Sequence, residues 1–130
     1  MVKTIMVVDD NADVITSIKY GLEGITDEFQ VIGADSGKQC LSFLLQNKIP
    51  DLILLDIMMP EMNGWETFNK LKENKTWKKI PVVFLTARID NIAKNAGRFL
   101  GEDYIEKPFE IQDVKNRISK VLEKKVSQTS

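Results

Sequence analysis

Runs of apolar residues of strand length alternate with segments of helical periodicity along this chain of 130 residues. The expected strands cover residues 4–8, 29–34, 52–55, 81–87 and 103–107. The first, third and fourth of these runs are apolar almost without interruption, as expected for parallel strands covered on both faces. Right-handed crossovers between such strands predict an α/β fold, an open doubly wound parallel sheet with helices on both faces.

Between the strands, apolar residues recur every three or four positions, which predicts helices. These helices are expected after Asn11 or Asp13, from Ser36, after Gly64, over 89–100 and over 111–122. The pattern is therefore a strand and a helix repeated five times, (βα)5, in a single domain over residues 1–124. The polar residues 125–130 are expected to form a C-terminal tail that frays. The lysine-rich segment 72–79 is expected to be a solvated loop.

Composition excludes several functions. The formal net charge of −1 provides no basic field for nucleic acid. Cys40 is the single cysteine, which rules out an intramolecular disulfide and fits a reducing, cytoplasmic environment. The absence of histidine excludes histidine catalysis, histidine metal ligands and a phosphohistidine on this chain. The apolar stretch near the N-terminus is too short for a signal peptide or a membrane span, so no membrane partner is expected.

Polar residues stand at the carboxyl ends of four expected strands. Asp9 and Asp10 follow the first, Asp56 the third, Thr86 ends the fourth and Lys107 the fifth. In an open parallel sheet these ends share one edge, where ligands bind. Three acids, a hydroxyl and an ammonium are therefore expected to meet in one shallow pocket.

This combination constrains the chemistry of the pocket. Three neighbouring carboxylates repel one another, so positive charge is needed to keep them all ionised. Lys107 supplies one charge, and the all-oxygen ligand set favours Mg²⁺ or Mn²⁺ for the rest. A phosphoryl group is a suitable guest for such a site, and Asp56 is placed to act as a nucleophile toward phosphorus. Positioning and charge neutralisation carry most of that reaction.

Each residue also has an ordinary structural interpretation. Asp9 and Asp10 are suitable helix caps, Asp56 is a suitable turn residue before Pro60, and Thr86 is common in strands. A lone lysine is usually a surface residue. Trp65, Phe68 and the methionines at 58, 59 and 62 are interpreted as packing residues. The joint placement at successive strand ends is what favours a functional site.

Four segments span nearly the whole chain: "VVDD" (7–10), "LLDIMMPEMNGWE" (54–66), "VVFLTA" (82–87) and "DYIEKPF" (103–109). Together, and in this order, they strongly resemble the receiver domain of two-component response regulators. The resemblance, rather than the periodicity, implies a flavodoxin-like sheet of strand order 2-1-3-4-5. It also implies a signalling domain like the stand-alone chemotaxis regulators.

The resemblance implies roles for individual residues. Asp56 corresponds to the phosphoacceptor, and Asp9 and Asp10 to the acidic pair that binds Mg²⁺ together with Asp56. Met58 would give the metal only its backbone carbonyl. Lys107, Thr86 and the backbone of Ala87 would contact the phosphoryl group.

Two further implications concern switching and the backbone. Thr86 and Tyr104 correspond to the switch residues, Thr86 moving toward the phosphoryl group and Tyr104 turning inward. The Lys107–Pro108 peptide bond is cis in the family, whereas X-Pro bonds in general are cis only occasionally.

The sequence departs from the family pattern at some positions. Leu100 and Gly101 stand where many receivers have Gly-Ala, so the pattern leaves the end of the fourth helix open by one residue. Met58 and Arg88 occupy positions that tune the access of water to the phosphoaspartate. Met58 is bulky and apolar, and Arg88 is long and cationic. We therefore expect them to shield the phosphoaspartate partly from water, so that it persists.

The resemblance implies a phosphoacceptor switch that receives its phosphoryl group from a sensor histidine kinase or a phosphotransfer protein. The fourth helix, fifth strand and fifth helix would then bind a downstream protein differently, as a monomer or a phosphorylation-dependent dimer. No turnover of an external substrate is expected. Two alternatives stay open: an aspartyl-nucleophile phosphatase, and a receiver-like interaction module that is never phosphorylated. Phosphatases of the haloacid dehalogenase type place a second Asp two residues after the nucleophile, where this chain has Met58.

Overall fold

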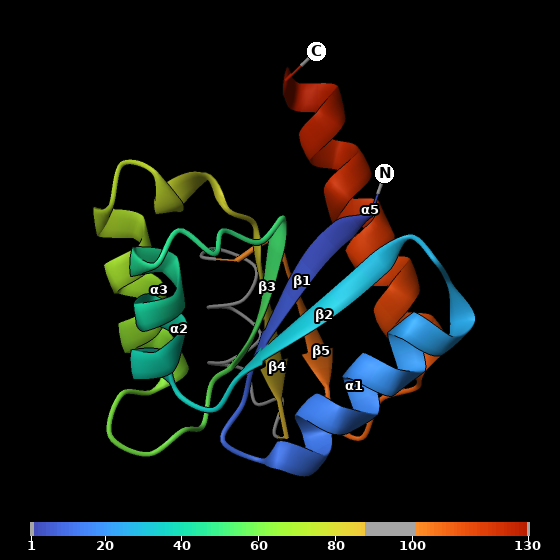
Figure 1. Cartoon of the computed structure of the whole chain (residues 1–130), viewed down its shortest axis with the longest axis horizontal. Coiled ribbons are helices and arrows are strands. Elements are labelled where there is room, and N and C mark those ends of the chain that lie inside the picture. Colours follow the sequence, from blue (N-terminus) through green and yellow to red (C-terminus); the bar gives the residue numbers. More distant parts are fainter. Residues whose placement is uncertain (1, 88–100, 130) are drawn as a thin grey trace.

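A computed structural model describes residues 2–87 and 101–129 of the chain. Five parallel strands form one sheet, and they are β1 (Lys3–Val8), β2 (Phe29–Ala34), β3 (Leu52–Asp56), β4 (Val82–Thr86) and β5 (Asp103–Glu106). Their order is β2-β1-β3-β4-β5, which confirms the doubly wound parallel sheet and the order 2-1-3-4-5. Each strand runs in the same direction, so all the carboxyl ends meet at one edge (Figure 1).

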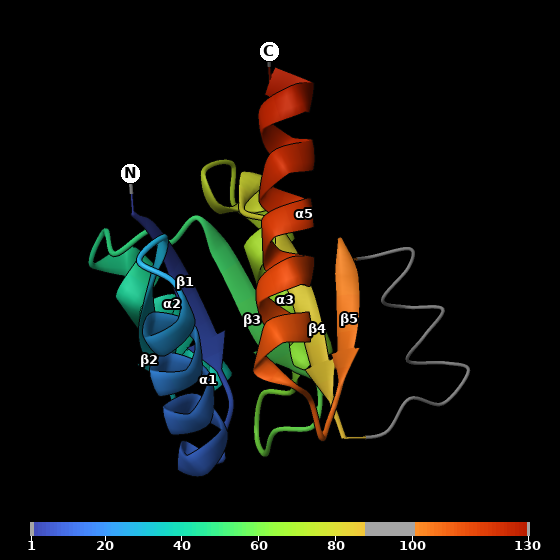
Figure 2. The ribbon, with the colours of Figure 1, turned by 90° about the vertical axis from the view of Figure 1, so that its right-hand side faces the viewer.

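Helices cover both faces of the sheet (Figures 1 and 2). The helices α1 (Ala12–Ile25) and α5 (Ile111–Thr129) lie on one face, and α2 (Gly37–Leu45) and α3 (Gly64–Glu73) on the other. Alternate residues of the strands point to opposite faces. Ile5, Val7 and Leu54 pack with α1 and α5, whereas Met6, Ile53 and Leu55 pack with α2 and α3. The helix expected over 89–100 lies outside the described residues.

Three helices begin at side chains that accept a backbone hydrogen bond, as helix N-caps do. The Asn11 side chain caps α1 by accepting from Asp13 N, so Asn11, and not Asp13, is the cap. The Ser36 side chain caps α2. Asn63 and Glu66 form a reciprocal capping box at the start of α3, which fixes the end of the loop that follows Asp56.

Two segments differ from the expectation. Helix α5 continues to Thr129, so the backbone of residues 125–129 is helical where a fraying tail was expected. The division of the chain at residue 124 stays a prediction. In the segment expected to be a solvated loop, Trp77–Lys79 form a short 3₁₀ turn, η1, because the Trp77 ring packs partly against the core beside α3.

Among the described residues, an ion pair lies beside the outer edge of each outer strand, Lys19–Glu23 at β2 and Arg117–Asp103 at β5. On β2, Val31 N donates to Glu23 Oε2 at 2.8 Å, and Lys19 Nζ donates to Val31 O at 3.0 Å. That backbone hydrogen bond, with help from Lys19, holds the pKa of Glu23 below its usual value.

The β5 edge is arranged in the same way. Tyr104 N donates to Asp103 Oδ1 at 2.8 Å, and Arg117 Nη1 lies 3.5 Å from Tyr104 O. Arg117 Nη1 also lies 3.0 Å from Asp103 Oδ2. At each outer edge, the acidic member of the ion pair accepts from the backbone N–H of one strand residue, Val31 or Tyr104. The basic member lies against the backbone carbonyl of that same residue.

Within the described residues, no helix combines the length and the apolar composition that crossing a bilayer requires.

Candidate functional site

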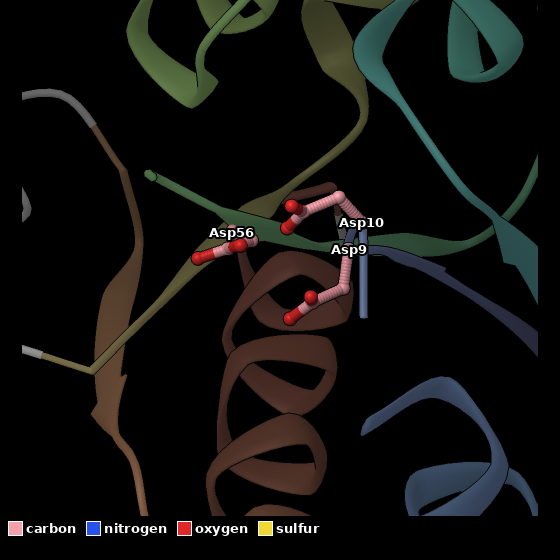
Figure 3. A group of neighbouring side chains, drawn as sticks. All are labelled: Asp9, Asp10 and Asp56. Carbon is pink, nitrogen blue, oxygen red and sulfur yellow. The ribbon is translucent and has the colours of Figure 1, made fainter. Parts of the chain in front are cut away.

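Three carboxylates meet at the carboxyl edge of the sheet. Asp9 and Asp10 follow β1, and Asp56 ends the neighbouring strand β3. One carboxylate oxygen from each lies within 4.8 Å of the others. Figure 3 shows the three side chains coming from these adjacent strand ends. Asp9 and Asp56 are buried, and Asp10 is exposed, so the cluster opens to solvent on the side of Asp10.

Lys107 brings a positive charge to this cluster. Its Nζ donates to Asp9 Oδ2 at 2.7 Å and lies 3.6 Å from Asp56 Oδ1. The lysine is held by its own backbone, because Lys107 N donates to Thr86 O at 2.7 Å. The Lys107–Pro108 bond that follows is cis. One ammonium is thus shared unequally between two buried carboxylates.

The pKa of Asp56 is raised to about 6. Burial is the main cause, and repulsion from Asp9 adds to it. Lys107 and a hydrogen bond from Met58 N act in the opposite direction without cancelling the rise. The charge of Lys107 therefore does not fully offset the burial and repulsion at Asp56. A bound cation would supply the additional positive charge.

The ordinary structural roles of two of these acids are also present. Asp9 Oδ1 accepts from Asn11 N at 2.8 Å, next to the cap of α1. Asp56 Oδ1 accepts from Met58 N at 3.3 Å, as a turn residue does. Both contacts orient the carboxylates at the sheet edge, so the local turn roles and the clustering are compatible.

The loop after Asp56 returns closely to the strand that it left. Gly64 N donates to Ile57 O at 2.9 Å. A Cβ on Gly64 would lie 2.7 Å from Ile57 Cα and would meet the Asp56 carbonyl oxygen. Backbone atoms cannot move aside as a flexible side chain can. This path of the loop beside Asp56 therefore requires glycine at position 64.

The remaining site residues predicted from the sequence occupy different surroundings. Thr86 is buried at the end of β4, and Ala87 follows it as an exposed residue. Tyr104 is half-buried and packs against the α3 side of the sheet, opposite Phe84 in the strand register. The Met58 side chain is 66% exposed, so it does not cover the carboxylates in this arrangement. Arg88 lies outside the described residues.

The donor set fits a hard divalent cation. Three carboxylates supply oxygen alone, and their separation is short enough for all of them to reach one ion. Oxygen donors suit Mg²⁺ and Mn²⁺, and a dication would relieve the repulsion that burial worsens. By contrast, the thiol of Cys40 is buried away from this cluster, and burial raises its pKa to about 12. Cys40 is therefore an unreactive packing residue.

Sequence reasoning did not identify Asp103 and Arg117 as a pair. Arg117 Nε also lies 3.0 Å from Asp113 Oδ2, so the guanidinium joins two acids beside Tyr104. The i,i+4 spacing of Asp113 and Arg117 is a visible signal for the helical part of this network. The contact with Asp103 depends on how α5 packs beside β5, which the spacing does not specify.

Comparison with known proteins identifies the family. The sequence profile of the response regulator receiver domain matches residues 5–119. The chain therefore belongs to the response regulator receiver domain family. Members of this family are regulatory signalling modules.

The chain is similar to parts of larger curated proteins. It is 40% identical over 125 residues to "Probable cyclic di-GMP phosphodiesterase" of Vibrio cholerae, covering 95% of this chain and 27% of that protein. It is 37% identical over 123 residues to the alkaline phosphatase synthesis transcriptional regulatory protein PhoP of Bacillus subtilis, covering 94% and 49%. The chain thus spans about half, or less, of the length of these relatives.

Solved structures of receiver domains share the fold. The N-terminal domain of a response regulator receiver protein from Methanoculleus marisnigri is 37% identical, with a TM-score of 0.74 and coverage of 94% of this chain and 98% of that one. The receiver domain of a Francisella response regulator is 28% identical, with a TM-score of 0.81 and the same coverage.

Proposed function

We propose that this domain is a phosphoacceptor switch in which Asp56 receives a phosphoryl group from a phosphohistidine on a separate protein. The donor is a sensor histidine kinase or a phosphotransfer protein. The single observation that carries the proposal is the convergence of three carboxylates, two of them buried, with Lys107 bridging Asp9 and Asp56. A purely structural cluster would gain nothing from a buried carboxyl with a raised pKa beside an opening to solvent at Asp10.

In the proposed reaction, a carboxylate oxygen of Asp56 attacks phosphorus. A new P–O bond forms as the P–N bond to the donor imidazole breaks, and the imidazole leaves with the electron pair. Asp9, Asp10, Asp56 and the backbone carbonyl of Met58 would hold Mg²⁺ or Mn²⁺. When bound, the cation supplies charge neutralisation for the phosphoryl oxygens.

Lys107, the Thr86 hydroxyl and the backbone of Ala87 hold the oxygens of the transferred group. Lys107 is already oriented by Asp9, which supports this role because no large movement is needed to reach a group on Asp56. Positioning and electrostatic stabilisation are the main requirements of phosphoryl transfer. The domain itself would turn over no external substrate.

The phosphoryl group would bind one arrangement of Thr86 and Tyr104 better than the other and so shift their population. Tyr104 on β5 is paired with Phe84 on the neighbouring strand β4. Phe84 in turn precedes Thr86 by two residues on β4. Movement at the phosphorylated edge would therefore reach β5 through adjacent residues. The proposed output is altered binding of a downstream protein at the face of the fourth helix, β5 and α5, in a cytoplasmic monomer or phosphorylation-dependent dimer.

The test is phosphorylation by a small acyl phosphate with Mg²⁺, followed by intact-protein mass spectrometry. We expect the native protein to gain one phosphoryl group and Asp56→Asn to gain none. Asp35→Asn is the matched control, because Asp35 also follows a strand at this edge of the sheet. A mass gain in Asp56→Asn, or none in the native protein, would contradict the proposal.

The same samples separate the two alternatives. Steady turnover of an aryl phosphate would favour an aspartyl-nucleophile phosphatase. A native protein that binds Mg²⁺ but is never phosphorylated, by the acyl phosphate or by a phosphorylated phosphotransfer protein, would favour an interaction module.

A further inference from the structure

Asn63 is the only asparagine of the chain that is followed by glycine, at Gly64. Asparagine in such a pair can deamidate without an enzyme, because the backbone nitrogen of the next residue can attack the carbon of the side-chain amide. Glycine favours this attack, since it has no Cβ to crowd the approach. The pair stands where the loop from β3 enters α3 (Figure 1).

The fold holds the two reacting groups in other contacts. The attacking atom, Gly64 N, is buried and donates to Ile57 O at 2.9 Å. The amide under attack is held by its oxygen, because Asn63 Oδ1 accepts from Glu66 N at 3.0 Å. Asn63 N donates in turn to Glu66 Oε1 at 3.2 Å. The reaction therefore requires the start of α3 and the loop before it to open first.

Two features of the same loop favour its opening. Glu61 has a φ of 64°, in the left-handed region that residues with a Cβ adopt at a cost, so opening the loop releases strain. Asn63 also lines a hollow of about 510 Å³ together with the exposed residues Met58 and Pro60. The half-buried amide of Asn63 can meet water there, and ammonia can leave by the same route.

We propose that Asn63 is a self-modification site, which opening of the β3–α3 loop converts to aspartate or isoaspartate. Water or hydroxide removes the proton of Gly64 N, and this nitrogen attacks Cγ of Asn63. The new C–N bond closes a succinimide ring. The bond from Cγ to the side-chain nitrogen breaks, and that nitrogen leaves as ammonia with the electron pair and a proton from water. Water then opens the ring at either carbonyl, so water is the single co-reactant.

The two products differ in their effect on the fold. Aspartate keeps the helix cap, because its carboxylate can accept from Glu66 N as the amide does. Isoaspartate carries the main chain through the former side chain and lengthens it by one methylene. The backbone at Gly64 has no room for this change, since even a Cβ there would meet the Asp56 carbonyl oxygen. Isoaspartate at position 63 would therefore displace the loop beside Asp56.

The consequence for signalling rests on the proposed function. If Asp56 accepts a phosphoryl group, displacement of the neighbouring loop should slow that reaction, because phosphoryl transfer depends on positioning. Ageing of the protein would then lower its capacity for phosphorylation without lowering its amount.

The modification is tested by incubating the full chain in heavy-oxygen water and mapping its peptides by mass spectrometry. Ring opening incorporates the heavy oxygen and so marks each residue that deamidates. We expect the label at Asn63 and not at Asn69, which lies in the same helix but precedes a lysine. The folded protein should react roughly ten-fold slower, or more, than the chain unfolded in urea, because two hydrogen bonds must open first.

Glu66→Ala tests the gating of the reaction by the fold. It removes the acceptor of the Asn63 N–H and should speed labelling of the folded protein roughly five-fold. Glu73→Ala is the matched control, because Glu73 is exposed at the other end of α3 and should leave the rate unchanged.

Three results would overturn the proposal. An unlabelled Asn63 in the unfolded chain would show that the pair does not react. Equal rates in the folded and the unfolded chain, or in Glu66→Ala and the native protein, would show that loop opening does not control the reaction.

The effect on phosphorylation is measured on native protein and Asn63→Ser aged side by side. Serine also caps a helix but has no amide to lose. With the acyl phosphate and Mg²⁺, the aged native protein should lose phosphorylation rate in proportion to its isoaspartate content, and Asn63→Ser should keep its rate. Equal losses in both would refute the link to Asn63. If fresh native protein gains no phosphoryl group, the proposed function fails, whereas labelling of Asn63 still decides the modification site.

Discussion

The ammonium of Lys107 is hydrogen-bonded to Asp9, at 2.7 Å, and only within charge contact of Asp56, at 3.6 Å. The lysine therefore stabilises the carboxylate that is more deeply buried and leaves Asp56 with a raised pKa. A bound dication would compete with Lys107 for the same carboxylates. The balance between these two cations leads to the first prediction.

Replacing Lys107 with methionine should destabilise the metal-free protein and increase the stabilisation that Mg²⁺ provides. Removing one partner of a buried ion pair leaves an uncompensated charge, at a cost of roughly 2–4 kcal/mol here, because the lysine is partly exposed. Mg²⁺ would then bind without competition and stabilise the folded state by mass action. Urea unfolding in EDTA and in Mg²⁺ measures both effects. Lys120→Met, an exposed substitution on α5, is the control and should change neither the stability in EDTA nor the gain from Mg²⁺. If Mg²⁺ stabilises the native protein and Lys107→Met equally, Lys107 and the cation do not compete.

Asp56→Asn should raise the free energy of unfolding of the metal-free protein, and the gain should depend on pH. The folded pKa of Asp56 is about 6, against 3.8 for an unperturbed carboxyl. Between these values the folded state binds more protons than the unfolded state, so native stability falls as pH rises through this window. The gain from Asp56→Asn should reach about 2–3 kcal/mol above pH 6 and shrink toward pH 4.

Urea titrations in EDTA at several pH values measure this difference, and titrating groups that do not interact with Asp56 contribute equally to both proteins. A gain that is constant with pH would mean that ionisation of Asp56 is not its cause.

Gly64→Ala should destabilise the protein by roughly 2–4 kcal/mol, because the new Cβ would meet the backbone of Asp56 and Ile57. It should also slow phosphorylation of Asp56 by displacing the loop beside it. Gly24→Ala is the control, since a Cβ on Gly24 meets nothing within 4 Å. As a substitution inside α1 it should stabilise by about 0.5–1 kcal/mol. Thermal unfolding of Gly64→Ala and Gly24→Ala measures both effects. Similar melting temperatures for the two variants would contradict the predicted clash at Gly64.

Met58→Ala should shorten the lifetime of the phosphoaspartate if Met58 shields it from water. The side chain is 66% exposed here, so shielding requires it to fold over the site once a phosphoryl group is present. We expect a native lifetime longer than seconds, measured by loss of the phosphoryl mass after removal of the donor. An unchanged lifetime in Met58→Ala would exclude the shielding role, and a native lifetime of seconds would exclude persistence altogether.

Much of the fold could be predicted because its signals are local. The apolar runs of β1, β3 and β4 are long enough to mark buried parallel strands, and each is followed by a polar residue at its carboxyl end. That is why the clustering of Asp9, Asp10 and Asp56 followed from the sequence. Strand order did not follow from periodicity and depended on the resemblance to receiver domains.

Contacts that depend on packing were not predictable. The preference of Lys107 for Asp9 over Asp56 is decided by a difference of less than an ångström in side-chain placement. The contact of Arg117 with Asp103 requires α5 to lie beside the edge of β5. The burial of Trp77 likewise depends on packing against a neighbouring helix. The local sequence around it is rich in lysine and therefore predicted only a solvated loop.

The ion pairs at the two outer strands also affect how copies of this protein meet. An open sheet usually offers a row of unpaired amides and carbonyls on each side, and such a row can template the sheet of another molecule. Here the row is interrupted at Val31 on one side and at Tyr104 on the other. A strand added at either side would have to displace an ion-paired side chain before it could pair with the backbone of Val31 or Tyr104. Edge-to-edge pairing is therefore opposed electrostatically at these two positions.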